Sequence, residues 1–157
     1  MKRHAIPILM SVLTVAIILL PASVFAQDTP GVTGAGAAAL PANSALSGVT
    51  LSGLQFGVSV YIPGDATAEG QFQATLLGTT ILGLTQNIEV LGTATSGSNG
   101  TGTRTFSGTA TVDMGDGTLP LTNVPITVAV TSTSLSLTIG TTNLPAATLI
   151  GGVITIE

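Results

Sequence analysis

Very few side chains of this chain could take part in chemistry. Without Met1–Ala26, the remaining 131 residues contain no Cys, His, Lys or Trp and only one Arg. Acid–base catalysis, nucleophilic catalysis and transition-metal binding depend largely on those residue types. The charged groups that remain are one cation, Arg104, and seven carboxylates, namely Asp28, Asp65, Glu69, Glu89, Asp113, Asp116 and Glu157.

The carboxylates are the only candidates for catalysis. Two carboxylates can divide the roles of acid and base, as they do in glycosidases and aspartic proteases. Most of these acids fall in expected turns or at outward-facing strand positions. No His or Lys follows residue 26 to activate a Ser or Thr hydroxyl. We therefore expect a protein that is not an enzyme, with no catalytic, cofactor-binding or metal-ligating residue and no cofactor.

One local pair of acids, Asp113 and Asp116, lies in the segment DMGDG. Calcium takes about six to eight oxygen ligands, and this segment offers too few of them. We expect a glycine-rich turn in which the Asp side chains accept hydrogen bonds from nearby backbone N–H groups. Arg104 falls on the inward-facing register of its strand, where we expect it to pair with an acid at the mouth of the fold.

A second pattern is a row of hydroxyls on alternate residues, which could bind ice or a crystalline polysaccharide. Ice-binding arrays repeat at a fixed length, and no such repeat occurs here. The strand propensity of Thr accounts for the row, so we expect an ordinary solvent-facing surface. The row consists of Thr101, Thr103, Thr105, Ser107, Thr109 and Thr111, and Asp113 shares its face.

Exposed aromatic side chains are typical of carbohydrate-binding surfaces. Among the aromatic residues, only Tyr61 takes an outward register, which is weak evidence for such a surface.

The net charge limits the partners. From Gln27 onward the charge is −6, and a single Arg cannot form the basic surface that nucleic acids or anionic membranes require. We expect no nucleic-acid partner and, after signal cleavage, no membrane partner. Self-association and contact with a cell surface or polysaccharide stay as alternatives.

The first 26 residues have the pattern of a secretory signal peptide. A positive head, Lys2-Arg3-His4, precedes the apolar run Ala5–Leu20, and Val24-Phe25-Ala26 supplies small residues for cleavage. The run is shorter than the roughly 20 residues of a spanning helix, which argues against an uncleaved anchor. We predict a signal-peptide helix over 1–26 and a secreted protein, extracellular or periplasmic. The absence of Cys favours bacterial or archaeal export.

The rest of the chain divides by composition. Residues 27–46 are rich in Gly, Ala and Pro, which predicts a flexible linker, with a strand around Val32 as the weaker alternative. From residue 47 to 157 apolar and polar residues alternate with period two, which predicts a single all-β domain.

Eight segments carry this alternation. In the clearest one, Leu54, Phe56, Val58, Val60 and Ile62 share a face. The loop 96–100 separates two of the segments, and its Asn-Gly pair favours a hairpin turn. We predict an antiparallel meander of about eight or nine strands that forms a barrel or a sandwich. The segments are Leu54–Ile62, Glu69–Leu77, Thr79–Thr85, Asn87–Thr95, Thr101–Asp113, Leu121–Thr131, Ser134–Ile139 and Ile150–Glu157.

Five short strand motifs occur in order: Phe56–Tyr61, Gly70–Phe72, Thr105–Val112, Ile126–Val128 and Gly151–Ile156. Over residues 47–157 the chain resembles the small all-β domain that follows choice-of-anchor regions in bacterial surface proteins. The turn 113–121 departs from that pattern. The resemblance implies an accessory extracellular module without a known active site, and it transfers no functional residue.

Two functions follow from the sequence. The first is a secreted, non-enzymatic surface or extracellular-matrix accessory protein that acts through a polar β surface of low charge. The alternative is a small β-barrel that binds an apolar ligand in its interior. Filled and hollow barrels share the same alternation, so the sequence does not separate the two.

Overall fold

The structure of the protein, a computed structural model, describes residues 30–157. The predicted signal peptide, 1–26, and residues 27–29 of the predicted linker lie outside the described residues. Within residues 30–157 no helix is long and apolar enough to cross a membrane.

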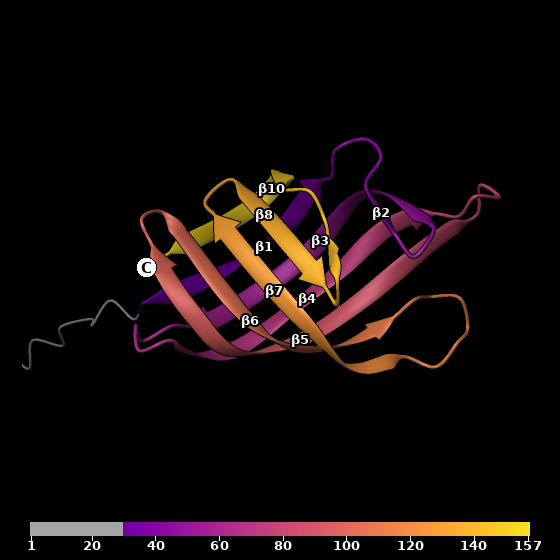
Figure 1. The fold of residues 1–157 in the computed structure, drawn as a ribbon. Coiled ribbons are helices and arrows are strands. Elements are labelled where there is room, and N and C mark those ends of the chain that lie inside the picture. Colours follow the sequence, from indigo (N-terminus) through magenta and orange to yellow (C-terminus); the bar gives the residue numbers. More distant parts are fainter. Residues whose placement is uncertain (1–29) are drawn as a thin grey trace, which may run out of the picture.

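The described chain is a single antiparallel sheet of ten strands (Figure 1), so the predicted all-β meander is confirmed. The longest strand, β5, has 16 residues. The strands are β1 (Gly31–Ala39), β2 (Ala45–Leu46), β3 (Val49–Tyr61), β4 (Thr67–Thr79), β5 (Thr85–Gly100), β6 (Thr103–Asp113), β7 (Leu121–Thr131), β8 (Ser134–Ile139), β9 (Thr142–Asn143) and β10 (Ala147–Ile156).

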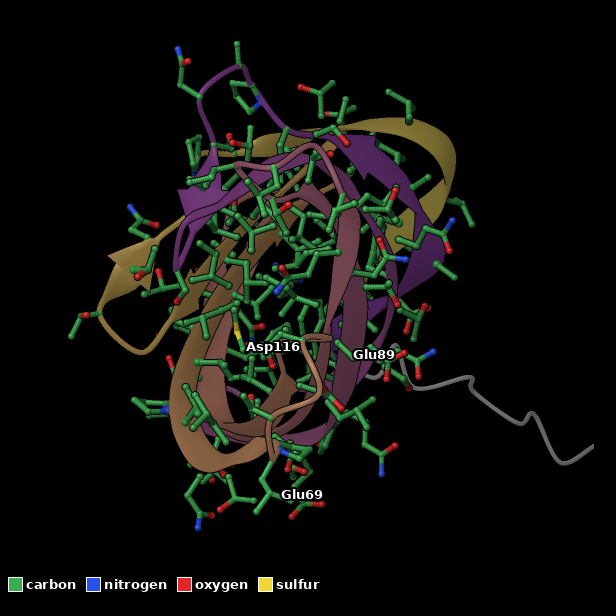
Figure 2. The ribbon with its side chains drawn as sticks, turned by 90° about the vertical axis from the view of Figure 1, so that its right-hand side faces the viewer. Glu69, Glu89 and Asp116 are labelled. Carbon is green, nitrogen blue, oxygen red and sulfur yellow. The ribbon has the colours of Figure 1, made fainter. Side chains whose placement is uncertain are left out.

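The strand pairings return on themselves. Strands β3 to β8 pair in sequence order, β10 follows β8, and β1 pairs with both β10 and β3. Eight strands therefore have a neighbour on each side, and we call them the ring: β1, β3, β4, β5, β6, β7, β8 and β10. Figure 2 shows these strands surrounding a centre that is filled with side chains.

The prediction of a flexible linker is wrong for Gly31–Ala39, which form strand β1. This strand pairs with Gly53–Tyr61 of β3 along its whole length and with Thr148–Ile156 of β10 along nearly all of it. Its Gly and Ala residues show no alternation of apolar and polar side chains. The strand is held instead by backbone pairing with two neighbours. The all-β domain therefore begins at Gly31 and not at residue 47.

Two further boundaries differ from the prediction. Thr79–Thr85 is not a strand: β4 ends at Thr79, β5 begins at Thr85, and the residues between them form the turn. The N–H of Gly83 donates to the main-chain oxygen of Thr80 at 2.9 Å and closes that turn. The predicted loop 96–100 belongs to β5, and the chain turns at Thr101-Gly102.

The inward faces of the strands make one apolar core, as the alternation predicts. Phe72 and Phe106 lie in its centre, with ring centroids 6.1 Å apart and an edge-to-face angle of 60°. Both rings are almost fully buried, and this geometry is a favourable one for aromatic pairs. The inward set predicted for β3 is buried throughout: Leu54, Phe56, Val58, Val60 and Ile62.

The close fit of β1 against β10 can be tested with two alanine substitutions. A Cβ atom at Gly36 would overlap the main-chain oxygen of Gly151, whereas a Cβ at Gly151 would meet nothing within 4 Å. We expect Gly36→Ala to lower the free energy of unfolding by about 1–3 kcal/mol, because backbone atoms must shift.

The matched control, Gly151→Ala, should change the free energy of unfolding by no more than about 0.5 kcal/mol. Denaturant unfolding of the two variants measures the difference. Equal effects would contradict the tight packing of β1 in the ring.

Candidate functional site

Two neighbouring grooves lie on the outer face of the sheet over β1, β3, β4 and β5. Their volumes are about 490 Å³ and 400 Å³. Gln73 and Leu91 line both of them, so the two grooves form one surface, which we call the outer groove. Its other side chains with polar groups are Gln55, Ser59, Gln71, Thr75, Glu89 and Thr93.

Strand register brings these side chains together. Because successive residues of a strand point to opposite faces, the residues between the core positions all face outward. Thr75 pairs with Gln55 on one side and Glu89 on the other. Gln73 lies between Gly57 and Leu91 in the next outward row. The groove is thus built from rows that cross three strands.

Gly57 shapes the middle of the outer groove. A Cβ atom there would lie 3.0 Å from Nε2 and 3.3 Å from Cγ of Gln73. The side chain of Gln73 therefore lies across the bare backbone of Gly57, where a larger residue would lift it. This places one amide between the two halves of the groove.

The outer groove offers hydrogen bonds without positive charge. Amide side chains both donate and accept, and hydroxyls do the same. Leu91, which is 57 % exposed, adds an apolar contact, and Glu89 is the only charged residue in the lining. Such a lining suits a neutral ligand rich in hydroxyl groups. Tyr61, the outward aromatic of the sequence analysis, pairs with Glu69 and does not line the groove.

The acids in turns cap the backbone, as predicted. Asp113 accepts from the N–H of Gly115 at 2.9 Å, and Asp116 accepts from the N–H of Thr118 at 3.0 Å and from its hydroxyl at 2.7 Å. Asp65 accepts from Thr67 in the same way. Hydrogen bonds from the Thr hydroxyl and then the Thr N–H hold the pKa of Asp65 and of Asp116 below the ordinary value.

The acids do not gather into a site. Figure 2 shows that Glu69, Glu89 and Asp116 do not converge on a common point. Among residues 30–157, no group of three or more His, Cys, Asp or Glu side chains could hold a metal ion. Glu89 and Asp113 are opposite each other on β5 and β6, but Asp113 is already engaged by its own turn.

Arg104 is half-buried, and its partners are main-chain oxygens. Its guanidinium donates to Gly100 at 2.8 Å and to Thr103 at 3.2 Å, and its Nε donates to the main-chain oxygen of Glu157 at 3.1 Å. The predicted partner was an acidic side chain; the structure instead shows the main chain of the last residue. Arg104 thus ties the β5–β6 turn to the end of β10.

The hydroxyl row lies mostly on β6, with Thr101 in the preceding turn. The hydroxyls of Ser107 and Thr127 are hydrogen-bonded to each other at 2.9 Å, so part of the row is satisfied within the sheet. Similar pairing joins Thr131 to Ser134 at 2.8 Å on the neighbouring strands. These contacts favour the ordinary surface that strand propensity predicts.

The outer groove was not found from the sequence. The alternation correctly places Gln55, Gln71 and Gln73 on outward registers. The predicted meander pairs neighbouring strands, but it does not give the register of β3 against β4, which brings the three amides together. The closely spaced Gln71 and Gln73 were the one local signal.

The comparisons add no family. Neither the family models, nor the curated proteins, nor the solved structures give a match to the chain.

The capped turns predict a specific response to acid. Since the pKa of Asp116 is lowered in the folded protein, its contribution to stability is present above the ordinary value of 3.8 and is lost as the pH falls through the lower folded value. We expect Thr118→Val to unfold at a lower temperature than the parent at neutral pH, and this difference should shrink below about pH 4.

Thermal unfolding between neutral pH and strong acid measures this effect. Thr109→Val, on the exposed face of β6, is the control and should keep a constant offset from the parent. A Thr118→Val offset that stays constant across the whole range would contradict the role of Asp116.

Proposed function

We propose that this protein is a secreted, non-enzymatic accessory protein of a cell surface or extracellular matrix, which binds a neutral polysaccharide in the outer groove. The observation that carries this proposal is a lining of amides and hydroxyls on a surface of low charge. Export rests on the signal-peptide pattern of residues 1–26. The resemblance to domains that follow choice-of-anchor regions agrees with an accessory role.

We further infer that the ring is a closed β-barrel of eight strands, with its ligand on the outside. The pairing of β1 with both β3 and β10 supports closure. A barrel of eight strands has room either for its own side chains or for one small ligand, and thirty buried apolar residues form the core here. This packing gives the alternative, an apolar ligand in the interior, less support than the outer groove.

The chemistry of the outer groove favours binding over hydrolysis. Glycosidases need two carboxylates on opposite sides of the bond that is cleaved. Glu89 is the one carboxylate in the lining, and its neighbour Asp113 caps a turn. The groove can therefore hold sugar hydroxyls through its amides, but it lacks a second free acid placed across from Glu89.

Retention on insoluble glycans tests the proposal. We expect the secreted chain to bind at least one of amorphous cellulose, granular starch or insoluble β-1,3-glucan. Each of Gln55→Ala and Gln73→Ala should weaken binding about threefold to tenfold, the loss expected for one hydrogen bond. Thr155→Ala, at an exposed position of β10 that does not line the groove, is the matched control and should bind like the parent.

The same samples separate binding from catalysis. Neither the parent nor Glu89→Gln should release reducing sugar, and Glu89→Gln should still bind the glycan. Retention that is unchanged in both Gln variants, or no retention on any glycan, would overturn the assignment of the groove. Release of sugar that Glu89→Gln abolishes would overturn the non-enzymatic function.

A further inference from the structure

One end of the ring carries exposed aliphatic side chains. Glu89 on β5 is opposite Asp113 on β6, so the turn that precedes β5 and the connection that follows β6 lie at the same end. The β4–β5 turn and the β6–β7 connection both project at the right of Figure 1. The Nε2 of Gln86 donates to the main-chain oxygen of Met114 at 2.7 Å and links their bases.

We call these two projections the apolar tips. In the first, Ile81 is 89 % exposed, Leu82 81 % and Leu84 63 %. In the second, Leu119 is 89 % and Leu121 57 % exposed. Large aliphatic side chains in contact with water are energetically costly, and clustering at one end of a molecule marks an interaction surface.

Internal hydrogen bonds fix the shape of both tips. In the first, Thr80 donates its N–H to the main-chain oxygen of Leu84 at 2.9 Å and accepts the N–H of Leu84 on its hydroxyl at 3.2 Å. In the second, Thr118 is bound to Asp116 through both its N–H and its hydroxyl. The aliphatic side chains are therefore presented by ordered turns.

From these observations we propose that the apolar tips insert into the surface of a neutral lipid layer. Each tip is convex and separate, and a deformable apolar phase accepts such projections without preformed pockets. Among residues 30–157 no cation lies at this end, since Arg104 binds Gly100 and Glu157 at the other. Two copies that met through their second tips would bring two Asp116 side chains together, which disfavours self-association there.

The charged side chains near the tips determine which lipid is bound and how deeply the tips insert. Residues 70–88, which include the whole first tip, contain no charged side chain. Asp116 in the second tip is held ionised by its two hydrogen bonds from Thr118, so it must stay in the polar headgroup layer. Anionic headgroups should repel it. The expectation of no membrane partner rested on the lack of a basic surface for anionic lipids. Insertion of the apolar tips needs no basic residue, and it does not depend on the outer groove.

Co-sedimentation of the secreted chain with phosphatidylcholine vesicles tests the proposal. We expect measurable binding that falls several-fold when half of the lipid is replaced by phosphatidylglycerol. The double variant Ile81→Gln and Leu82→Gln should lose about tenfold or more of the binding, because two apolar side chains no longer leave water. Asp116→Asn should recover part of the binding to the anionic vesicles.

The matched control replaces two other exposed aliphatic residues, Ile150→Gln and Val153→Gln on β10, which are 70 % and 63 % exposed. It should bind vesicles like the parent, and the tip variant should still bind glycan like the parent. Absence of binding to phosphatidylcholine, or equal losses in both double variants, would overturn the proposal. Light scattering gives a second test. An oligomer of the parent that is abolished only in the tip variant would also overturn the proposal, because the tips would then dock on a second copy.

Discussion

The whole arrangement depends on the backbone pairing of β1 between β3 and β10. A strand with only one neighbour leaves a row of N–H and C=O groups without partners, which invites pairing with other chains. β8 and β10 share only two residue pairs, Ala147 with Leu135 and Thr148 with Ser134. β1 therefore joins β3 to β10 through two long pairings although it is poor in large side chains, and the β8–β10 pairing is the shortest in the ring.

The strand pairing separates two environments that share the same strands. Inward positions hold aliphatic and aromatic residues, and outward positions hold Thr, Ser and Gln with very few charges. Apolar burial supplies the main driving force, while hydroxyls and amides keep the outer face hydrated. A surface of this kind can form hydrogen bonds with neutral partners, but it lacks the positive charge that binds polyanions. The turns keep their geometry through Asp caps rather than through ion pairs.

The sequence predicts those parts of the fold that side-chain alternation encodes. The inward set of β3, from Leu54 to Ile62, was correct because burial on one face imposes period two. For β1, a flexible linker was preferred over a strand around Val32, because Gly34, Ala35 and Gly36 carry no such period and backbone pairing leaves no mark on composition. The alternation of Leu82 and Leu84 indicated a strand, but both belong to a turn with exposed side chains. The outer groove depends on cross-strand register, which single-strand patterns do not specify.

Strands β4 and β5 connect the outer groove to the first of the apolar tips. Leu91 lines the groove and Leu84 lies in the first tip, and both belong to the continuous stretch that leads into β5. Seven residues of extended chain span about 23 Å. A molecule whose tips touch a lipid surface would thus hold its groove roughly 20 Å from that surface. Gly31 and Glu157 pair at the opposite end of the ring, so the described termini would point away from the lipid. On these two proposals, the sheet would act as a spacer that sets the height at which the bound polysaccharide is held above the lipid.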